Sequence, residues 1–334
     1  MHRWTDLADV PDGFGPSVVT IGNFDGVHRG HVSVLTRLVA DARASGASAV
    51  AVTFTPHPQQ VHRPEQAPPL LTGDADRLEL LAGTGLDAVL LLPYTLGFAR
   101  QTPAEFVERY LVGGLAARTV VVGRDVRFGW ENAGDLSTMV ELGRRYGFTV
   151  EVLEDVVPEP SASEGEGHRR WSSTWVRELL DAGDVVGAAH VLGRPHRLRG
   201  VVVHGDARGR ELGFPTANLA PDAAGMVPAD GVYAGWLRRV GAPGGAAADA
   251  PEVLPAAVSI GTNPTFAGLQ RRVEAYVLDR TDLDLYDEEV VLELVDRLRP
   301  TERFDSVEAL VEQMHDDVAR ARVVLADGPA PTAR

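Results

Sequence analysis

The sequence predicts an α/β domain followed by a small antiparallel β-barrel. Strand-like and helix-like segments alternate through the first half of the chain, which is typical of a parallel sheet covered on both faces. Strand-like runs follow one another in the second half without long helices between them, which is typical of a barrel. A chain of 334 residues is long enough for two such domains.

Hydrophobic spacing gives the expected elements of the first half. Strands are predicted at residues 18–21, 48–55, 87–92, 117–122 and 148–153. Helices are predicted after Gly30, after Thr102, and at residues 74–81 and 136–145. The string Thr102-Pro103-Ala104-Glu105 is typical of a capped helix start. Residues 59–72 and 158–167 are expected to form loops, the second of them mobile.

The second half begins near Gly193, after a predicted helix at residues 185–192. Strands are predicted at residues 200–204, 231–237, 256–260, 273–278 and 290–298, with a flexible hairpin insertion at 241–250. A last helix opens at Asp305-Ser306, and its apolar side is expected to comprise Val307, Leu310, Val311, Met314, Val318 and Ala321. We assign residues 1–185 to the first domain, 186–326 to the second and 327–334 to a disordered tail.

Composition limits the classes of function. The net charge of −15 argues against a nucleic-acid surface, and the absence of cysteine excludes disulfides, thiolate metal sites and cysteine nucleophiles. The N-terminal residues contain no apolar export segment, and the longest apolar run, at 88–93, is too short to cross a bilayer. We therefore expect a cytoplasmic protein that binds small molecules, with neither nucleic acid nor a membrane as partner. The oligomeric state, a homo-oligomer included, stays open.

The segment Gly22-Asn23-Phe24-Asp25-Gly26-Val27-His28-Arg29-Gly30-His31 lies between a predicted strand and a predicted helix. Backbone N–H groups at such a turn, next to a helix N-terminus, bind anionic phosphate. His28 and His31 are about one helical turn apart and can donate hydrogen bonds to phosphate oxygens as charge develops. A single histidine at a helix start is more often a surface residue, but this combination favours a phosphate site.

This segment resembles the H-x-G-H signature of the nucleotidylyltransferase superfamily, whose members join a nucleotide to a phosphate and release pyrophosphate. The longer string G-N-F-D-G-V-H-R-G-H resembles the adenylyltransferase half of the bacterial bifunctional riboflavin kinase/FAD synthetase family. The resemblance implies a Rossmann-like nucleotidylyltransferase domain with His28 and His31 in catalysis. It also implies an ATP site that includes Gly22, Phe24, Asp25, His28 and His31.

A second string, Ser172-Ser173-Thr174-Trp175-Val176-Arg177, follows the predicted mobile loop. Hydroxyls at a helix start, with Arg177 in its first turn, suit a polyphosphate, although each residue alone is an ordinary helix-start residue. The string resembles the family's S-S-T-x-x-R motif. The resemblance implies ATP contacts from Ser172, Ser173, Thr174 and Arg177, and Trp171 stands where the family usually has Ile.

Two further segments resemble the flavin side of the family's adenylyltransferase site. Phe54-Thr55-Pro56-His57-Pro58 matches the F-x-P-H-P loop, with a rigid turn as the alternative of equal weight. Gly123-Arg124-Asp125-Val126-Arg127-Phe128-Gly129 resembles the G-x-[N/D]-F-x-F-G segment, although Val126 replaces the aromatic residue. The resemblance implies flavin contacts from Phe54, Pro56, Pro58 and Asp125.

Residues 205–218 carry glycines around arginines, which suggests a loop over phosphates. Thr216 and Asn218 face the same side of an extended backbone, and their hydroxyl and amide oxygens are hard ligands suited to Mg²⁺ carried by a nucleotide. The ordinary alternative is a turn and an edge strand. The chain has no lysine, so a Walker A lysine is excluded.

The string G-F-P-T-A-N within this segment resembles the G-x-P-T-A-N motif of riboflavin kinases. The resemblance implies a second ATP site, with Mg²⁺ held at Thr216 and Asn218. Its ATP-binding residues would be Gly205, Arg208, Gly213, Pro215, Thr216 and Asn218.

Glu274 is the expected base of the kinase step. Strand alternation turns Val273, Ala275 and Val277 to the core and Glu274 to an open side. Phosphoryl transfer to an alcohol needs a group that takes or orients the hydroxyl proton, and Glu274 stands where riboflavin kinases carry their base. The competing carboxylate is Asp287, which replaces a glycine in the family's D-L-Y-G string.

Together the two motif sets imply two activities. Riboflavin would be phosphorylated by ATP to FMN, and FMN would be adenylylated by a second ATP to FAD, with Mg²⁺ as cofactor. Two alternatives stay open. One is an adenylyltransferase for another phosphate substrate, such as phosphopantetheine or a nicotinate nucleotide, and the other is a non-catalytic flavin-binding protein.

Overall fold

The structure, a computed structural model, describes residues 1–153, 169–205, 209, 212–240, 252–265 and 268–328, with side chains left undescribed over 263–270. The chain divides into two compact units. One comprises Met1–Pro69 and Asp74–Ser172, and the other comprises Leu70–Gly73 and Ser173–Arg334. Each unit has its own sheet and its own hydrophobic core.

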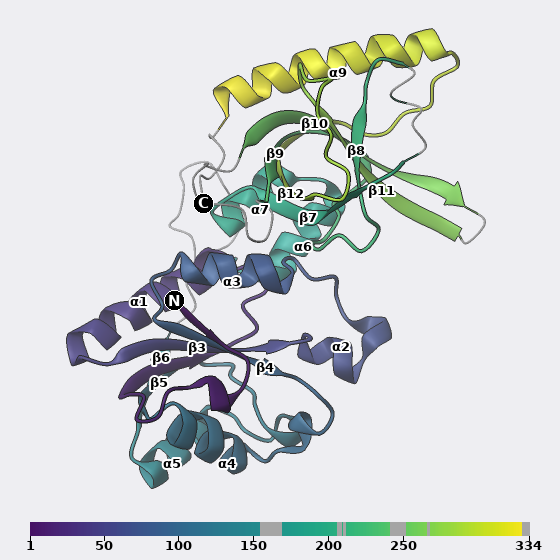
Figure 1. Cartoon of the computed structure of the whole chain (residues 1–334). Coiled ribbons are helices and arrows are strands. Elements are labelled where there is room, and N and C mark those ends of the chain that lie inside the picture. The colour runs from purple at the N-terminus through teal and green to yellow at the C-terminus, as the bar shows by residue number, and fades with distance from the viewer. Residues whose placement is uncertain (154–168, 206–208, 210–211, 241–251, 266–267, 329–334) are drawn as a thin grey trace. The chain divides into compact units, whose positions relative to one another are not determined.

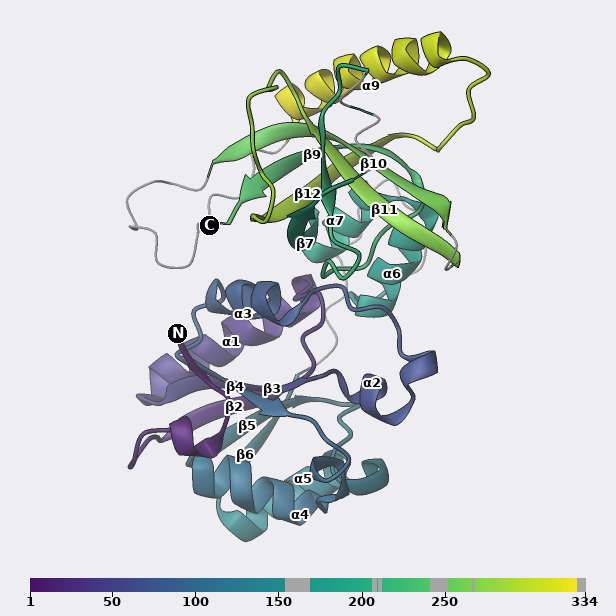
Figure 2. The same ribbon diagram turned by 45° about the vertical axis from the view of Figure 1, so that its right-hand side comes forward.

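A parallel sheet forms the centre of the first unit (Figures 1 and 2). Its strands are β1 (His2–Trp4), β2 (Ser17–Ile21), β3 (Ser48–Thr55), β4 (Ala88–Pro93), β5 (Ala117–Gly123) and β6 (Thr149–Leu153), in the order β1-β4-β3-β2-β5-β6. The predicted strands are confirmed to within one residue at each end. The edge strand β1 was not predicted, because three residues are too few to show a period.

Helices cover both faces of this sheet (Figures 1 and 2). On one face lie α1 (Arg29–Ser45) and α3 (Asp74–Ala82), whose Leu35, Leu38 and Leu81 are fully buried. The other face carries α4 (Pro103–Phe106), the π-helical η4 (Val107–Gly114) and α5 (Leu136–Tyr146). Because both faces are covered, inner strands such as β3 are mostly apolar along their whole length.

The expectation of a loop over residues 59–72 is partly wrong. Its first half holds α2 (Pro58–His62) and the 3₁₀ turn η2 (Pro64–Gln66). His57 Nδ1 accepts a hydrogen bond from the Gln59 N–H at 3.2 Å, which caps α2. Both short helices begin at a proline. The first N–H groups of a helix make no hydrogen bond within it, so proline, which lacks an N–H, is tolerated there. The loop expected at 158–167 lies outside the described residues.

The second unit contains a closed antiparallel barrel, which confirms the predicted fold class. Its strands are β7 (His196–Val203), β8 (Thr216–Leu219), β9 (Gly231–Arg239), β10 (Val253–Thr265), β11 (Gly268–Val277) and β12 (Glu289–Arg299), in the order β10-β11-β8-β7-β12-β9. Several strands are longer than predicted, because their polar ends are paired across the barrel. Arg197 on β7, for example, forms a buried ion pair at 2.8 Å with Glu293 on β12.

Three helices of the second unit matter for its sites: α6 (Ser173–Ala182), α7 (Val185–Leu192) and α9 (Val307–Asp327). α9 packs on β9, β10 and β12, and the Ser306 hydroxyl caps it by accepting from the Ala309 N–H at 3.1 Å. Val307 was expected on the apolar side but is 57% exposed, because the first turn precedes the part that packs on the barrel. Residues 241–250 and 329–334 lie outside the described residues.

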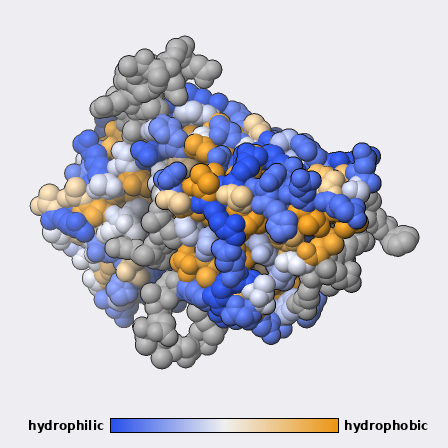
Figure 3. All heavy atoms as spheres, turned by 90° about the horizontal axis from the view of Figure 1, so that it is seen from above, coloured by the Kyte–Doolittle hydropathy of each residue, from blue (hydrophilic) through white to orange (hydrophobic). Residues whose placement is uncertain are grey.

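Apolar surface is scattered rather than collected on the face seen in Figure 3, where hydrophobic residues lie in groups among hydrophilic ones. Exposed large side chains such as Leu96, Val186 and Val323 are ordinary at a protein surface. Among the described helices, none combines the length and apolar character needed to span a membrane.

His196 makes the stability of the second unit depend on pH. Its side chain is 2% exposed, and its Nε2 donates to the Met226 carbonyl at 2.7 Å. Burial lowers the pKa of His196 from 6.5 to about 4; the hydrogen bond to Met226 opposes this shift, and Arg194 adds to it. Because the folded pKa is below the unfolded one, the stabilisation is fully present above pH 6.5 and is lost as pH falls toward 4.

We expect the unfolding free energy to fall by roughly 2 kcal/mol more in the wild type than in His196→Gln between pH 7 and pH 5, because glutamine does not titrate. Urea unfolding of both proteins at the two pH values measures the difference. Parallel loss of stability in the two proteins would show that other groups carry the pH dependence.

Candidate active sites

β2 lies where the strand order of the parallel sheet reverses. β3 and β4 extend the sheet to one side of β2, and β5 and β6 extend it to the other. Ligands of open parallel sheets bind at the carboxyl ends of the strands beside such a reversal. Residues 22–31 connect β2 to α1 at this edge, so the predicted phosphate turn stands where the fold favours a ligand.

This turn has a constrained backbone. Phe24, Gly26 and Val27 have φ angles of 49°, 81° and 40°, in the left-handed region that side chains disfavour. Phe24 and Val27 are nevertheless held there by burial, at 3% and 2% exposure. A Cβ on Gly22 would lie 2.9 Å from the Phe24 ring, so a larger residue there would displace this buried ring. Strain of this kind is typical of binding turns.

His28 and His31 stack on each other at the N-terminus of α1. Their ring centroids are 3.7 Å apart and their planes differ by 21°. His28 caps the helix, because its Nδ1 accepts a hydrogen bond from the His31 N–H at 3.4 Å. The two imidazoles therefore lie on the same side of the turn, as their spacing predicted.

Hydrogen bonding assigns a tautomer to each ring. His28 Nδ1 accepts an N–H, so its proton belongs on Nε2. His31 Nδ1 is buried and has no hydrogen-bond partner within the described part of the chain, so a proton on Nε2 avoids burying an unpaired N–H at Nδ1. Burial and the neighbouring His28 lower the pKa of His31 well below 6.5, which keeps the ring neutral at neutral pH. With its proton on Nε2, the His31 ring can donate to a ligand from that nitrogen.

Arg77 on α3 supports this turn and was missed from the sequence. The residue is 3% exposed, and its guanidinium donates to the carbonyls of Asn23 at 2.9 Å and Phe54 at 2.8 Å. It also pairs with Asp74 at 2.6 Å. Arg77 thus ties the phosphate turn to the end of β3. Its sequence signal, an arginine three residues after an aspartate, is typical of surface ion pairs and did not reveal the burial.

Trp171 fixes the start of the S-S-T-x-x-R string. A Cβ on Gly30 would lie 3.2 Å from the Trp171 Cβ, and the Arg29 guanidinium stands 5.9 Å from the indole centroid. Ser172 follows immediately and is the last residue of the first unit. The string therefore begins beside the first turn of α1 and its histidine pair.

The rest of this string lies on α6, in the second unit. The helix begins at Ser173, so Arg177 is its fifth residue. The prediction of Arg177 in the first turn is therefore wrong by about one position, because Ser173 is itself helical.

Phe54, one of the predicted flavin residues, lies at the end of β3 in an aromatic group. Its ring centroid is 5.7 Å from those of Tyr94 and Phe98. Pro56 follows the strand and Pro58 opens α2. An apolar, aromatic strand end of this kind provides a surface on which a planar ring can pack.

Asp125, the other predicted flavin residue, lies just beyond β5. Its side chain is 71% exposed and pairs with Arg170 at 3.3 Å. Val126, which replaces the family's aromatic residue, packs against the core under β5 instead. The replacement therefore has a packing role.

The predicted kinase residues come together on the neighbouring strands β8 and β11. Asn218 is paired in register with Glu274. The Thr216 hydroxyl donates to Glu274 Oε2 at 3.4 Å, and Asn218 Nδ2 donates to Thr216 Oγ1 at 3.4 Å. Glu274 is half-buried between the buried Val273 and Ala275, as strand alternation predicted.

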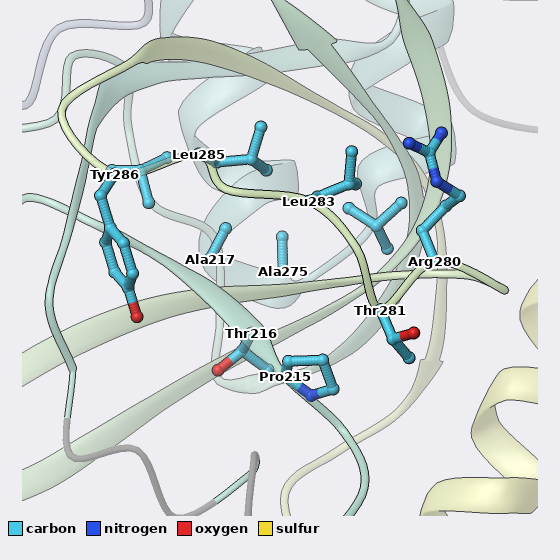
Figure 4. A pocket seen from close by; sticks show the side chains of 11 residues that line it. Pro215, Thr216, Ala217, Ala275, Arg280, Thr281, Leu283, Leu285 and Tyr286 are labelled. Atoms are coloured by element: carbon cyan, nitrogen blue, oxygen red, sulfur yellow. The ribbon is translucent and has the colours of Figure 1, made fainter.

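Thr216 lines two cavities. The smaller, of about 50 Å³, is lined by Val202, Pro215, Thr216, Ala217, Ala275, Val277, Arg280, Thr281, Leu283, Leu285 and Tyr286. In Figure 4 its alanine and leucine side chains gather at one end, while the hydroxyls of Thr216 and Tyr286 point away from it. The Tyr286 ring stacks on His204 with centroids 3.8 Å apart. This cavity is therefore apolar inside and polar at its Thr216 end.

The larger cavity, of about 250 Å³, lies between the barrel and α9 and contains Glu274. Its remaining lining residues are Gly209, Leu212, Phe214, Thr216, Val232, Ala257, Ser259, Tyr276, Arg299, Leu310, Met314, Asp317 and Val318. Arg299 Nε and Nη2 donate to the Asp317 carboxylate at 2.9 and 2.7 Å, which holds α9 to β12 at this cavity. Of its two carboxylates, Asp317 is paired with Arg299, so a largely apolar cavity with the Glu274 carboxylate suits a flat, hydroxyl-bearing ligand.

Three of the other four residues predicted to bind ATP at this site lie in the described part of the chain. A Cβ on Gly205 would lie 2.6 Å from the Asn218 side chain, so glycine allows this close approach. Gly213 has a φ of 87°, a turn conformation that glycine adopts freely. Pro215 lines the smaller cavity. Arg208 lies outside the described residues.

Asp287 is exposed and lines neither of these two cavities. Its φ of 62° explains why the family has glycine there, and aspartate tolerates this conformation. Its carboxylate is therefore poorly placed to compete with Glu274.

Within the described residues, no group of three or more His, Asp or Glu side chains is arranged to hold a metal ion. The Thr216 hydroxyl lies beside the Glu274 carboxylate, and the Asn218 amide turns Nδ2 toward Thr216, so Asn218 supplies a second oxygen ligand once its amide is turned over. This donor set fits Mg²⁺ provided that most of its ligands are nucleotide phosphates and water, which is how Mg²⁺ commonly binds with nucleotides.

Comparisons with known proteins agree with the two sites. A family model of FAD synthetase matches residues 12–163, and one of riboflavin kinase matches residues 192–325. Two relatives carry the name bifunctional riboflavin kinase/FMN adenylyltransferase. The Escherichia coli K12 protein is 35% identical over 91% of both chains, and the Pseudomonas fluorescens protein is 39% identical over 92% of this chain and 93% of its own.

A solved structure from Streptococcus pneumoniae, described as a macrolide-efflux protein, has the same fold. It is 30% identical, covers 96% of this chain and 98% of its own, and has a TM-score of 0.79. With both family models and the full-length relatives in agreement, the chain belongs to the bifunctional riboflavin kinase/FMN adenylyltransferase family and has both activities, forming FMN from riboflavin and FAD from FMN with ATP.

Proposed function

We propose that riboflavin is phosphorylated in the barrel, beside Thr216 and Glu274. The observation that supports this is that Thr216 lines both cavities, whereas Glu274 lines only the larger one. In phosphoryl transfer the attacking and leaving oxygens lie roughly in line on either side of the transferred phosphorus. Riboflavin would therefore occupy the larger cavity, with the γ-phosphate of ATP near Thr216; the smaller cavity, of about 50 Å³, is too small to enclose a nucleotide.

In this reaction the Glu274 carboxylate takes or orients the proton of the terminal ribityl hydroxyl. The hydroxyl oxygen then bonds to the γ-phosphorus, the bond from that phosphorus to the β–γ bridging oxygen breaks, and ADP leaves. The Thr216 hydroxyl, 3.4 Å from Glu274 Oε2, keeps the carboxylate beside the phosphate. Thr216 and Asn218 would hold Mg²⁺, which when bound neutralises charge on the nucleotide phosphates.

We propose that FMN is adenylylated at the turn between β2 and α1. An oxygen of the FMN phosphate bonds to the α-phosphorus of ATP, and pyrophosphate leaves. The Nε2–H groups of His28 and His31, together with the N-terminus of α1, stabilise the charge on the phosphate oxygens. Further ATP contacts would come from Gly22, Phe24, Asp25, Ser172, Ser173, Thr174 and Arg177, and flavin contacts from Phe54, Pro56, Pro58 and Asp125.

Chromatography of the products over time tests this assignment. Riboflavin with Mg-ATP should give FMN first and FAD later, and EDTA should stop both steps. An adenylyltransferase for another phosphate substrate would form neither product, and a non-catalytic flavin carrier would bind riboflavin without converting it. Since both steps use ATP, we propose that the protein acts in the cytoplasm.

We also propose that the activities divide between residues 1–185 and 186–326, which can be tested with a kinase fragment. The boundary at 185/186 falls within α7, whose Ala188, Val191 and Leu192 are buried, so the fragment should start before α6, at Arg169. A fragment of residues 169–328 is expected to phosphorylate riboflavin at a rate close to that of the whole chain and to form no FAD. FAD formation by this fragment would contradict the division.

A further inference from the structure

A row of side chains crosses the barrel wall along the larger kinase cavity. Glu274 on β11 pairs in register with Asn218 on β8 on one side and with Ser259 on β10 on the other. Ser259 in turn pairs with Val232 on β9. Residues directly opposite each other on paired strands point to the same side of the sheet. Glu274, Ser259 and Val232 accordingly all line the larger cavity.

The chemical character of this row changes along its length. Glu274 offers a half-buried carboxylate, and the next residue, Ser259, is exposed and offers a hydroxyl. Val232, at 9% exposure, packs in an apolar cluster with Val318 of α9. Riboflavin has its groups in the matching order, which is a terminal hydroxyl, then the secondary hydroxyls of the ribityl chain, then a flat ring system.

The spacing of the row also suits the ribityl chain. Paired strands lie about 4.8 Å apart, so Ser259 is roughly one such step from Glu274 and Val232 roughly two. When the terminal hydroxyl of riboflavin is at Glu274, the secondary hydroxyls therefore pass Ser259. The exposed serine hydroxyl is accessible there and can both donate and accept a hydrogen bond.

We propose that Ser259 is a substrate-binding residue of riboflavin phosphorylation, whose hydroxyl bonds to a secondary hydroxyl of the ribityl chain. This contact makes the site selective for a hydroxyl-bearing chain over a plain alkyl chain on the same ring. The inference rests on the proposed role of Glu274 as the base that receives the terminal hydroxyl.

The competing role for Ser259 is to orient the Glu274 carboxylate, because the two residues are directly opposite each other. Kinetics separate the two roles. Loss of a contact that is equally strong in the ground state and the transition state raises KM and leaves kcat unchanged. Loss of support for the base lowers kcat instead, since the base acts only in the chemical step.

The test uses the full-length protein and measures riboflavin phosphorylation. Ser259→Ala is expected to raise KM for riboflavin roughly 3–10-fold, the usual effect of losing one neutral hydrogen bond, with kcat and KM for ATP within about twofold of the wild type. Ser259→Thr keeps a hydroxyl and suits a strand, so it should recover most of the loss. The matched control is Thr301→Ala, which removes an exposed hydroxyl that lines neither kinase cavity and should change nothing.

Riboflavin analogues that each lack one secondary ribityl hydroxyl identify the bonded group. For the analogue without that hydroxyl, Ser259→Ala should lower kcat/KM much less than it does for riboflavin, because the contact is already missing. An equal loss with every analogue would overturn the inference, as would a fall in kcat with an unchanged KM for riboflavin.

Glu274→Gln, assayed alongside, separates this inference from the assignment on which it depends. Unchanged KM for riboflavin in Ser259→Ala, together with an impaired Glu274→Gln, would overturn the role of Ser259 alone. Near-normal turnover in Glu274→Gln would overturn the placement of the terminal hydroxyl, and the inference with it.

Discussion

Replacing Glu274 by glutamine is expected to lower kcat for FMN formation by about 10²–10⁴-fold, the usual range for loss of general-base assistance. Glutamine keeps the size of the side chain and can still bond to the Thr216 hydroxyl, but it has no basic oxygen. Since the cavity around residue 274 keeps its shape, KM for riboflavin and ATP should change little. Conversion of FMN to FAD should be unaffected, because that reaction uses the other site.

Asp287→Asn is the matched control for Glu274→Gln. It also neutralises a carboxylate in the second unit, but Asp287 is exposed and lines neither kinase cavity. Riboflavin kinase turnover of the two variants, measured side by side, decides between the carboxylates. Near-normal turnover in Glu274→Gln would refute its role as the base, and a large loss in Asp287→Asn would transfer that role.

The parallel sheet could be predicted closely because the burial of its strands is visible in their apolar sequences. β3 is buried on both faces and lies between Gly46 and Pro56, so a largely apolar run rich in Val and Ala marks it from Ser48 to Thr55. The barrel strands are less visible in the sequence. The start of β7 carries Arg197, and a charged residue argues against a buried strand. Only the folded structure shows that Glu293 pairs with this arginine. Such a pairing depends on tertiary structure, which local patterns do not record.

The candidate sites were predictable to a similar degree. Thr216, Asn218 and Glu274 could be chosen from strand alternation and motif resemblance, and these three do meet. The residues that support the sites could not. Arg77 looks like an ordinary charged residue of a helix, and its bonds to the distant carbonyls of Asn23 and Phe54 exist only in the folded chain. Motifs therefore identify groups that touch substrate more readily than groups that position them.

Replacing His31 by alanine is expected to slow FMN adenylylation by about 10²–10³-fold, as for the loss of one transition-state hydrogen-bond donor. The neutral ring donates through Nε2–H, so the loss reflects a missing donor and not a missing positive charge. His31→Asn restores an N–H donor on a shorter side chain and should recover part of the rate. Riboflavin phosphorylation should persist in both variants.

A matched histidine in the same unit distinguishes catalysis from stability. His2→Ala removes an exposed imidazole that stacks on Trp4 at β1, and it should leave both reactions unchanged. Steady-state rates of both reactions and the melting temperature of each variant are the measurements. Because His31 stacks on His28 and contacts Phe24 in a constrained turn, its loss could instead weaken the fold. In that case both activities would fall together with the melting temperature, and His31 would be a structural residue.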